Sequence, residues 1–165
     1  MKNDIIFFSV VAIPQKAFNR ICLNILLITV LFSPTYTFSQ SVQCDEVPVT
    51  LIVGHFGRTE LPSILCEGQI YFSVPGLFQF LEIKNEVSND FTVVKGFLKD
   101  QNDTFLINET AQQINYKNKV FKLTSKDFIR PRTNLFLRSD YFSTIFGLEN
   151  EFSSRNLAAT LVPNF

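Results

Sequence analysis

Beyond residue 43, apolar side chains fall in short runs that polar turns separate, and the 3.6-residue period of a long amphipathic helix is rare. Several of the runs are rich in β-branched and aromatic residues, which is typical of strands. We expect strands over residues 47–53, 59–66, 70–74, 91–98, 104–107, 113–116, 120–123, 134–137 and 156–162. Turns are predicted at 54–57, 67–68 and 117–119, where glycine or polar residues interrupt the apolar runs.

Two segments carry helical signals. Pro75 stands where the first turn of a helix tolerates proline, and apolar residues follow it at helical spacing up to Leu81. Ser139 is a natural N-cap for a helix over residues 140–146, and Gly147 is placed to end that helix as a C′ glycine. The pattern as a whole predicts an α+β fold of mostly short antiparallel strands with two short helices.

A shift of 65 residues aligns the chain with itself. Residues 70–72 then match 135–137 in apolar character, and the apolar positions of the two predicted helices also coincide. The Asn-Glu pair at 85–86 falls on the identical pair at 150–151. We interpret this as a duplicated strand–helix–strand unit, with Phe80 and Phe146 expected to be buried on equivalent helices. The alternative is a chance match between two ordinary strand–helix pieces.

The paired unit resembles the stalk-type domain at the N-terminus of copper amine oxidases. The resemblance rests on residues 69–83 and 134–148, with the hairpin over 104–123 between them, and it spans about residues 46–162. The opening run resembles, more narrowly, the N-terminal periplasmic regions of bacterial usher-like or receptor-like outer-membrane proteins. One departure from the stalk pattern is that Glu82 stands opposite Gly147.

This resemblance implies a domain organisation and a context. It implies an N-terminal strand hairpin over 41–68 that forms one compact unit with a duplicated stalk-like domain over 69–165. It also implies that the chain belongs to a longer parent protein in which a barrel domain follows. It brings no catalytic residue, because the copper and cofactor chemistry of the amine oxidases belongs to their other domains.

The first forty residues differ in composition from the rest. Lys16 and Arg20 precede a mainly apolar stretch over residues 21–32, and a polar stretch follows up to Gln40. This order is typical of a secretory signal peptide, so residues 1–40 are predicted to be removed on export. The alternative is a membrane anchor, although the apolar stretch is shorter than the roughly twenty residues of a bilayer span. We expect an exported protein that is periplasmic or associated with the outer membrane, with no membrane span in the mature chain.

Two cysteines remain after such cleavage, Cys44 and Cys66. An even pair in an exported chain predicts a disulfide. Free or metal-binding thiols are the alternative, but a zinc site needs four ligands, and His55 is the only histidine that could supply a nitrogen. We therefore expect no metal site.

Charge and motifs argue against catalysis and against nucleic acid. The chain carries 15 basic and 15 acidic side chains, so it lacks the strong positive field that holds nucleic acid. No G-x-S-x-G nucleophile motif and no glycine-rich phosphate loop occurs in the sequence. We expect a protein that is not an enzyme and has no cofactor, and we keep a small hydrolase that depends on His55 as a minor alternative.

The charge is unevenly distributed in one part of the chain: residues 117–138 contain seven basic side chains and one acidic side chain, Asp127. On alternating strands these residues could form a basic face for an acidic partner or an anionic envelope polymer, although a solvated hairpin is the simpler interpretation. Among the many phenylalanines, those near predicted turns are candidates for an exposed contact. The candidate contact patch consists of Lys117, Lys119, Lys122, Arg130, Arg132, Phe56 and Phe128.

These observations favour a non-catalytic binding or docking module. We expect its partner to be a protein or another component of the cell envelope, and its context to be the N-terminal part of a larger usher-like or receptor-like outer-membrane protein. The alternative is a stand-alone periplasmic protein that binds cell-wall glycan.

Overall fold

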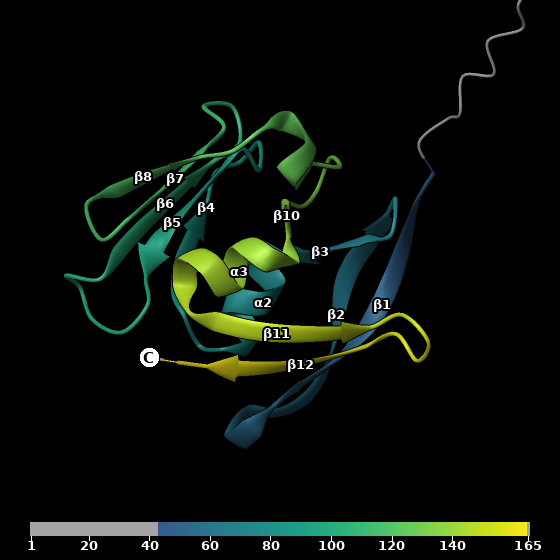
Figure 1. The fold of residues 1–165 in the computed structure, drawn as a ribbon. Coiled ribbons are helices and arrows are strands. Elements are labelled where there is room, and N and C mark those ends of the chain that lie inside the picture. Colours follow the sequence, from purple (N-terminus) through teal and green to yellow (C-terminus); the bar gives the residue numbers. More distant parts are fainter. Residues whose placement is uncertain (1–42, 165) are drawn as a thin grey trace, which may run out of the picture. The chain divides into compact units, whose positions relative to one another are not determined.

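The computed structural model describes residues 43–164, and the predicted signal peptide lies outside the described residues. The described part is mainly strand with two short α-helices. This agrees with the predicted α+β class, although the fold is mostly β in character. The strands form two sheets, and the helices α2 and α3 are labelled with them in Figure 1.

The larger sheet has seven strands, in the order β11-β12-β1-β2-β3-β10-β9. Their bounds are Leu148–Ser153 for β11, Ala158–Pro163 for β12, Cys44–Val53 for β1, Gly57–Cys66 for β2, Gln69–Ser73 for β3, Phe136–Arg138 for β10 and Phe128–Ile129 for β9. All neighbours are antiparallel except β1 and β12, which pair in parallel with Thr50 opposite Ala158. The C-terminal strand therefore closes the sheet against the first strand.

The smaller sheet is a meander of five strands in chain order. Its strands are β4 at Lys84–Val87, β5 at Val93–Phe97, β6 at Thr104–Asn108, β7 at Gln113–Tyr116 and β8 at Lys119–Lys122. Lys117 and Asn118 join the last two with φ of 49° and 61°, the left-handed pair that a tight hairpin turn requires. Glu67 and Gly68 form a similar turn between β2 and β3. Two 3₁₀ turns complete the fold, Gly54–Phe56 and Ser125–Asp127.

The predicted helix start with Pro75 in the first turn is confirmed for α2, whereas α3 begins differently from the prediction. In α2 (Val74–Phe80), the Oγ of Ser73 accepts a hydrogen bond from the Gly76 amide, and Pro75 lies in the first turn. Helix α3 (Ser139–Phe146) starts one residue earlier than expected, so Ser139 is its first residue and not its N-cap. Arg138 takes the N-cap position without a side-chain capping bond, and its guanidinium binds carboxylates instead.

The helices end in a shared backbone conformation. Gly147 follows α3 with φ of 67°, and its N–H donates to the Ser143 carbonyl, which confirms the predicted C′ glycine. Glu82 occupies the matching place after α2 with φ of 57°. The Glu82 N–H donates to the Gln79 carbonyl, and the Ile83 N–H donates to the Phe78 carbonyl, which is the Schellman pattern. The side chain thus departs from the stalk pattern while the left-handed turn is kept.

The strand–helix–strand order occurs twice. It is β3, α2 and β4 in one segment and β10, α3 and β11 in the other. Strands β3 and β10 pair with each other, and Phe72 lies opposite Leu137, the residue 65 positions later. The third strands go to different sheets, since β4 opens the five-stranded sheet and β11 forms an edge of the seven-stranded one.

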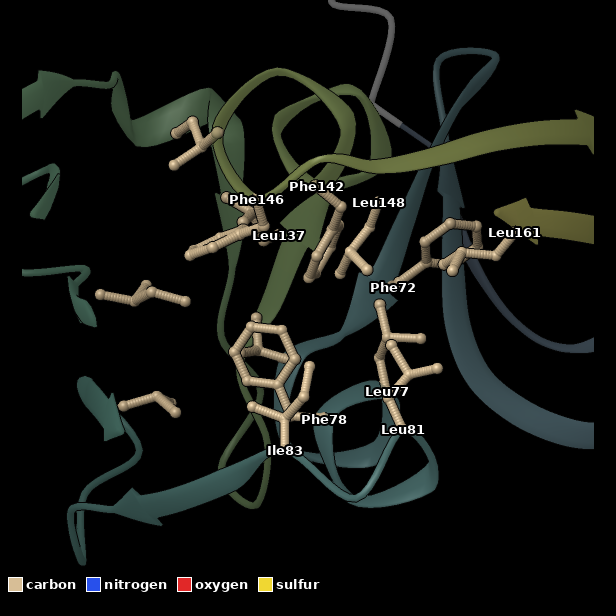
Figure 2. Close-up of a cluster of buried hydrophobic side chains, with 14 of the residues drawn as sticks. Phe72, Leu77, Phe78, Leu81, Ile83, Leu137, Phe142, Phe146, Leu148 and Leu161 are labelled. Atoms are coloured by element: carbon tan, nitrogen blue, oxygen red, sulfur yellow. The ribbon is translucent and has the colours of Figure 1, made fainter. Parts of the chain in front are cut away.

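The core lies where the helices meet the inner face of the five-stranded sheet (Figure 2). The Phe78 ring is the centre of an aromatic group, with the ring of Phe105 from β6 at 4.9 Å between centroids. Phe146 contacts Phe78 at 5.6 Å and Tyr116 of β7 at 5.4 Å. These rings join both helices to the sheet in one continuous apolar cluster.

The expected burial of Phe80 is wrong, whereas Phe146 is buried as predicted. Phe80 is only partly buried and packs near the Phe56 ring, at 6.3 Å between centroids. Phe78 is the fully buried aromatic of α2, and its counterpart 65 residues later is Ser143. The short helix turns Phe78, and not Phe80, toward the five-stranded sheet.

Candidate binding surface

The two faces of the five-stranded sheet differ in burial. Alternate residues such as Val94, Ile107 and Ile114 point to the core and are fully buried. The residues between them lie on the opposite face, where Leu106 stands between Lys95 and Asn115 of the neighbouring strands. This outer face keeps partly exposed apolar side chains, and Val120 on β8 is 57% exposed. An exposed large apolar side chain beside others is the kind of feature that marks a contact surface.

Two hollows lie over this sheet. One of about 670 Å³ covers β4 to β6, and one of about 290 Å³ covers β6 to β8. Thr104, Phe105 and Leu106 line both, so we treat the two as one outer groove. The groove is lined by Lys84, Asn85, Glu86, Lys95, Gly96, Phe97, Thr104, Phe105, Leu106, Asn115, Tyr116, Lys117, Asn118, Lys119 and Val120.

Gly96 allows the strands under the groove to approach closely. A Cβ at this position would overlap the Lys84 carbonyl oxygen and would lie 2.9 Å from the Phe105 ring. Only glycine therefore fits between β4 and β6 here.

The groove carries more positive than negative charge. Glu86 is the one acidic residue in its lining, and its carboxylate lies 2.9 Å from the Lys95 ammonium. The Lys117 ammonium lies 3.7 Å from the carboxylate of Asp103, whose side chain is largely shielded from solvent, and above the Tyr116 ring. The hydrogen bond and charge of Tyr116, with a smaller contribution from Asp103, raise the pKa of Lys117. Lys84 and Lys119 form no ion pair within residues 43–164.

Asn115 places an unusual acceptor in the groove. Its Oδ1 is shielded from solvent and has no hydrogen-bond partner among the described residues. A buried acceptor without a donor costs about 1–3 kcal/mol.

The structure divides the predicted contact patch. Lys117 and Lys119 lie at the β7–β8 turn and border the smaller hollow, but Lys119 pairs with the buried Tyr116 and so lies on the inner face, where both lysines also border a hollow beside α3. The ammonium of Lys122 donates to Gln113 Oε1 at 2.6 Å on the same sheet. The Arg130 guanidinium lies away from the groove, 3.4 Å from the Glu109 carboxylate. Arg132 is exposed in the loop before β10.

The two aromatic members of that patch are not exposed contacts. Phe128 is 6% exposed and belongs to the core, so its assignment as a surface contact is wrong. Phe56 is partly buried against the same core, near Phe80. The position of Phe56 and Phe128 near turns did not indicate exposure, because both rings pack inward against the core.

Arg138 belongs to a charged network outside the groove. Its guanidinium lies 2.7 Å from the buried Asp127 carboxylate and also binds Asp140. Burial raises the pKa of Asp127, but hydrogen bonds from Thr124 and the charge of Arg138 outweigh it and leave that pKa below its ordinary value. Desolvation raises the pKa of Tyr71, whose hydroxyl donates to the Lys126 carbonyl. This network holds the 125–127 turn against α3 and leaves Arg138 unavailable to a partner.

The Cys44–Cys66 disulfide is present, as the sequence predicts. The two cysteines are directly opposed at the open end of the β1–β2 hairpin. Their bond therefore clamps the strand pair at the end farthest from the 54–56 turn.

A histidine-dependent site, a metal site and a membrane span were considered for the described residues. His55 is exposed in that turn, beside the Phe56 ring. Within residues 43–164, no three histidine, cysteine or acidic side chains gather as a metal-binding group. None of the helices in the described part is long and apolar enough to cross a membrane.

Comparison with protein-family models, with curated proteins and with solved structures found no match.

Proposed function

We propose that this chain is a non-catalytic binding module of the cell envelope and that the outer groove is its contact surface. The observation that carries the proposal is the contrast between the faces of one sheet. The inner face is packed against the core, while the outer face has a hollow with partly exposed apolar side chains and with Lys84, which forms no ion pair within residues 43–164. Such a combination suits recognition of a partner more than it suits solvent.

The context of this module is a proposal from the sequence. The signal-peptide pattern and the disulfide both suit an oxidising compartment, such as the periplasm. The stalk-like resemblance supports an N-terminal position in a larger usher-like or receptor-like outer-membrane protein. It also supports origin by duplication, for which the 65-residue offset of two strand–helix–strand segments is the structural argument.

A photo-cross-linking residue can test the contact surface. We would place it at Leu106 in the groove and, as a matched control, at Val162, which is 51% exposed on β12 of the other sheet. In cells that produce the protein, position 106 should cross-link to an envelope partner and position 162 should not. Equal cross-linking at both positions, or none at 106, would contradict the proposal. Sedimentation of the protein with purified cell-wall glycan, unaffected by Leu106→Asp, would instead favour the stand-alone glycan binder.

A further inference from the structure

We infer that the side-chain amide of Asn102 is a glycan attachment site. The donor is an oligosaccharide carried on a lipid diphosphate, and the catalyst is an oligosaccharyltransferase of the cell envelope. Asn102 lies in the 98–103 connection between β5 and β6, which projects from the end of the five-stranded sheet (Figure 1). This inference goes beyond the proposed contact surface and shares with the proposed function only the expectation that the chain is exported.

The sequence around Asn102 has the pattern that such transferases recognise. Residues 102–104 are Asn-Asp-Thr, an Asn-x-Ser/Thr sequon without proline in the middle. Bacterial transferases of this kind also select an acidic residue two positions before the asparagine, whose carboxylate a basic side chain of the enzyme can bind, and Asp100 stands there. The chain has a second sequon at 108–110, but Leu106 occupies the acidic position before it. The first sequon therefore carries the complete pattern and the second does not.

The Asn102 side chain is accessible in the folded protein. Asn102 is exposed, and its side-chain amide forms no hydrogen bond with residues 43–164. Its backbone N–H, and not its side chain, donates to Asp100 Oδ1 at 2.7 Å. Thr104, the hydroxyl residue of the sequon, is also exposed, and its side chain has no hydrogen-bond partner in the described part of the chain. Asp103 between them turns inward and accepts a hydrogen bond from the Tyr116 hydroxyl at 3.3 Å, so the amide and the hydroxyl are the groups left to solvent.

Asn108, the asparagine of the second sequon, has different surroundings. It is half-buried at the end of β6, and its Oδ1 accepts the Ala111 N–H at 2.8 Å. The carboxylate of Glu109, the next residue, lies 3.4 Å from the Arg130 guanidinium. A transferase would have to break these contacts to reach Asn108. The structure therefore favours Asn102 as the acceptor and makes Asn108 an internal control.

The transfer is a substitution at the first sugar carbon of the donor. The Nδ2 atom of Asn102 forms a bond to that carbon, and the bond from the carbon to the diphosphate oxygen breaks. The lipid diphosphate leaves with the electron pair of the broken bond, and one amide proton passes to a base of the transferase. No group is oxidised or reduced, and the Asn102 carbonyl is kept in the product.

The test is the intact mass of the protein recovered from the envelope of the cells that naturally produce it, followed by mass mapping of its proteolytic peptides. We expect the mature chain to be heavier by one oligosaccharide, carried on the peptide that contains Asn102. Asn102→Gln, which keeps an exposed amide but lengthens the side chain, should lose the added mass completely. The matched control Asn108→Gln should keep it in full.

Variants of the neighbouring residues test how the site is recognised. Thr104→Ala should abolish the modification, whereas Thr104→Ser keeps the hydroxyl and should retain it. Asp100→Asn keeps an oxygen that can accept the Asn102 N–H but removes the negative charge. The fraction of modified Asp100→Asn chains should fall by about tenfold, because the transferase loses a charge-assisted contact. Circular dichroism melting checks that each variant is folded.

The outcomes separate this inference from the proposed function. An exported, processed chain without added mass, or full modification of Asn102→Gln, would overturn the glycan site and leave the contact surface untouched. A glycan that alkaline β-elimination releases, and that Thr104→Ala loses while Asn102→Gln keeps it, would overturn it in favour of an O-linked sugar on Thr104. Full modification of Asp100→Asn would overturn recognition by a transferase that selects the carboxylate. An unprocessed chain in the cytoplasm would refute export, on which the proposed function depends as well.

Discussion

Truncation of Phe146 tests how the two sheets are held together. The side chain is 2% exposed, and four other aromatic rings lie within 6.2 Å of its own ring, measured between centroids. Burial of a phenylalanine contributes about 1.5–3 kcal/mol, and the cavity and lost ring contacts raise the cost of Phe146→Ala to about 3–5 kcal/mol. Three of these rings come from α2, β6 and β7 and the fourth from α3 itself, so the loss falls mainly on the junction between the helices and the five-stranded sheet.

Urea unfolding, followed by far-ultraviolet circular dichroism, measures this loss. With a slope of about 2 kcal/mol per molar urea, the midpoint should fall by about 2 M. Phe80→Ala is the matched control, and it should cost only about 1–2 kcal/mol because that side chain is partly exposed. If Phe146→Ala does not fold, Phe146→Leu should still fold and lose about 1.5 kcal/mol. Equal losses for Phe80→Ala and Phe146→Ala would refute the packing argument.

Three further predictions concern the helix ends, the charged network and the disulfide. Glu82→Gly should raise the free energy of unfolding by about 0.5–1 kcal/mol, because φ of 57° strains a residue with a Cβ. Gly147→Ala should lower the free energy of unfolding by about as much. A lower free energy of unfolding for Glu82→Gly would contradict this argument. The pKa of Asp127 in the folded protein lies below its unfolded value of about 3.9. The contribution of the Asp127 carboxylate to stability is therefore complete above about pH 4, and it is lost as the folded protein takes up the proton at lower pH. Stability should fall as the pH drops below about 4. Asp127→Asn should be less stable at pH 7 but flatter in a pH series of melts, and an unchanged slope would argue against the network. Reduction of Cys44–Cys66, which are 22 positions apart, should cost about 3 kcal/mol in urea unfolding, and no change in midpoint would show that the bond adds nothing.

Local signals in the sequence predict much of the fold. The strand at 113–116 has the same bounds in the structure, and the turns at 67–68 and 117–119 form hairpins because their residues accept left-handed backbone angles. The disulfide was expected from two cysteines in a chain predicted to be exported. Strands β4, β9 and β11 have no counterpart among the expected strand ranges, and β9, at Phe128–Ile129, is only two residues long and has no pattern of its own. The parallel pairing of β1 with β12 joins residues about 108 positions apart, and no local pattern encodes such a contact.

The candidate site was harder to predict than the fold. Lys117 and Lys119 were identified from the run of basic residues, but the remaining groove residues come from separate strands. A usable signal existed in the alternation over 104–108, where Phe105 and Ile107 are buried and Leu106 faces outward. An apolar residue at a solvent-facing position of a strand indicates a contact surface, and Leu106 and Val120 both fit that description. The count of charges along the chain did not show this surface, because Asp127 and Glu109, which lie in turns, neutralise Arg138 and Arg130.

The difference between the two strand–helix–strand segments explains why a groove exists. Both segments share a core through the β3–β10 pair, yet only α2 carries an aromatic residue at the position of Phe78, and α3 has Ser143 there. The Phe78 ring packs edge-on against Phe105 and holds the five-stranded sheet by its inner face. Strand β4 starts that sheet directly after α2. Both helices lie on one side of strands β4 to β8 (Figure 1), and neither covers the outer face of this sheet. Phe78, which has no aromatic counterpart 65 residues later, thus anchors one face of the sheet in the core, and the other face is left for the groove.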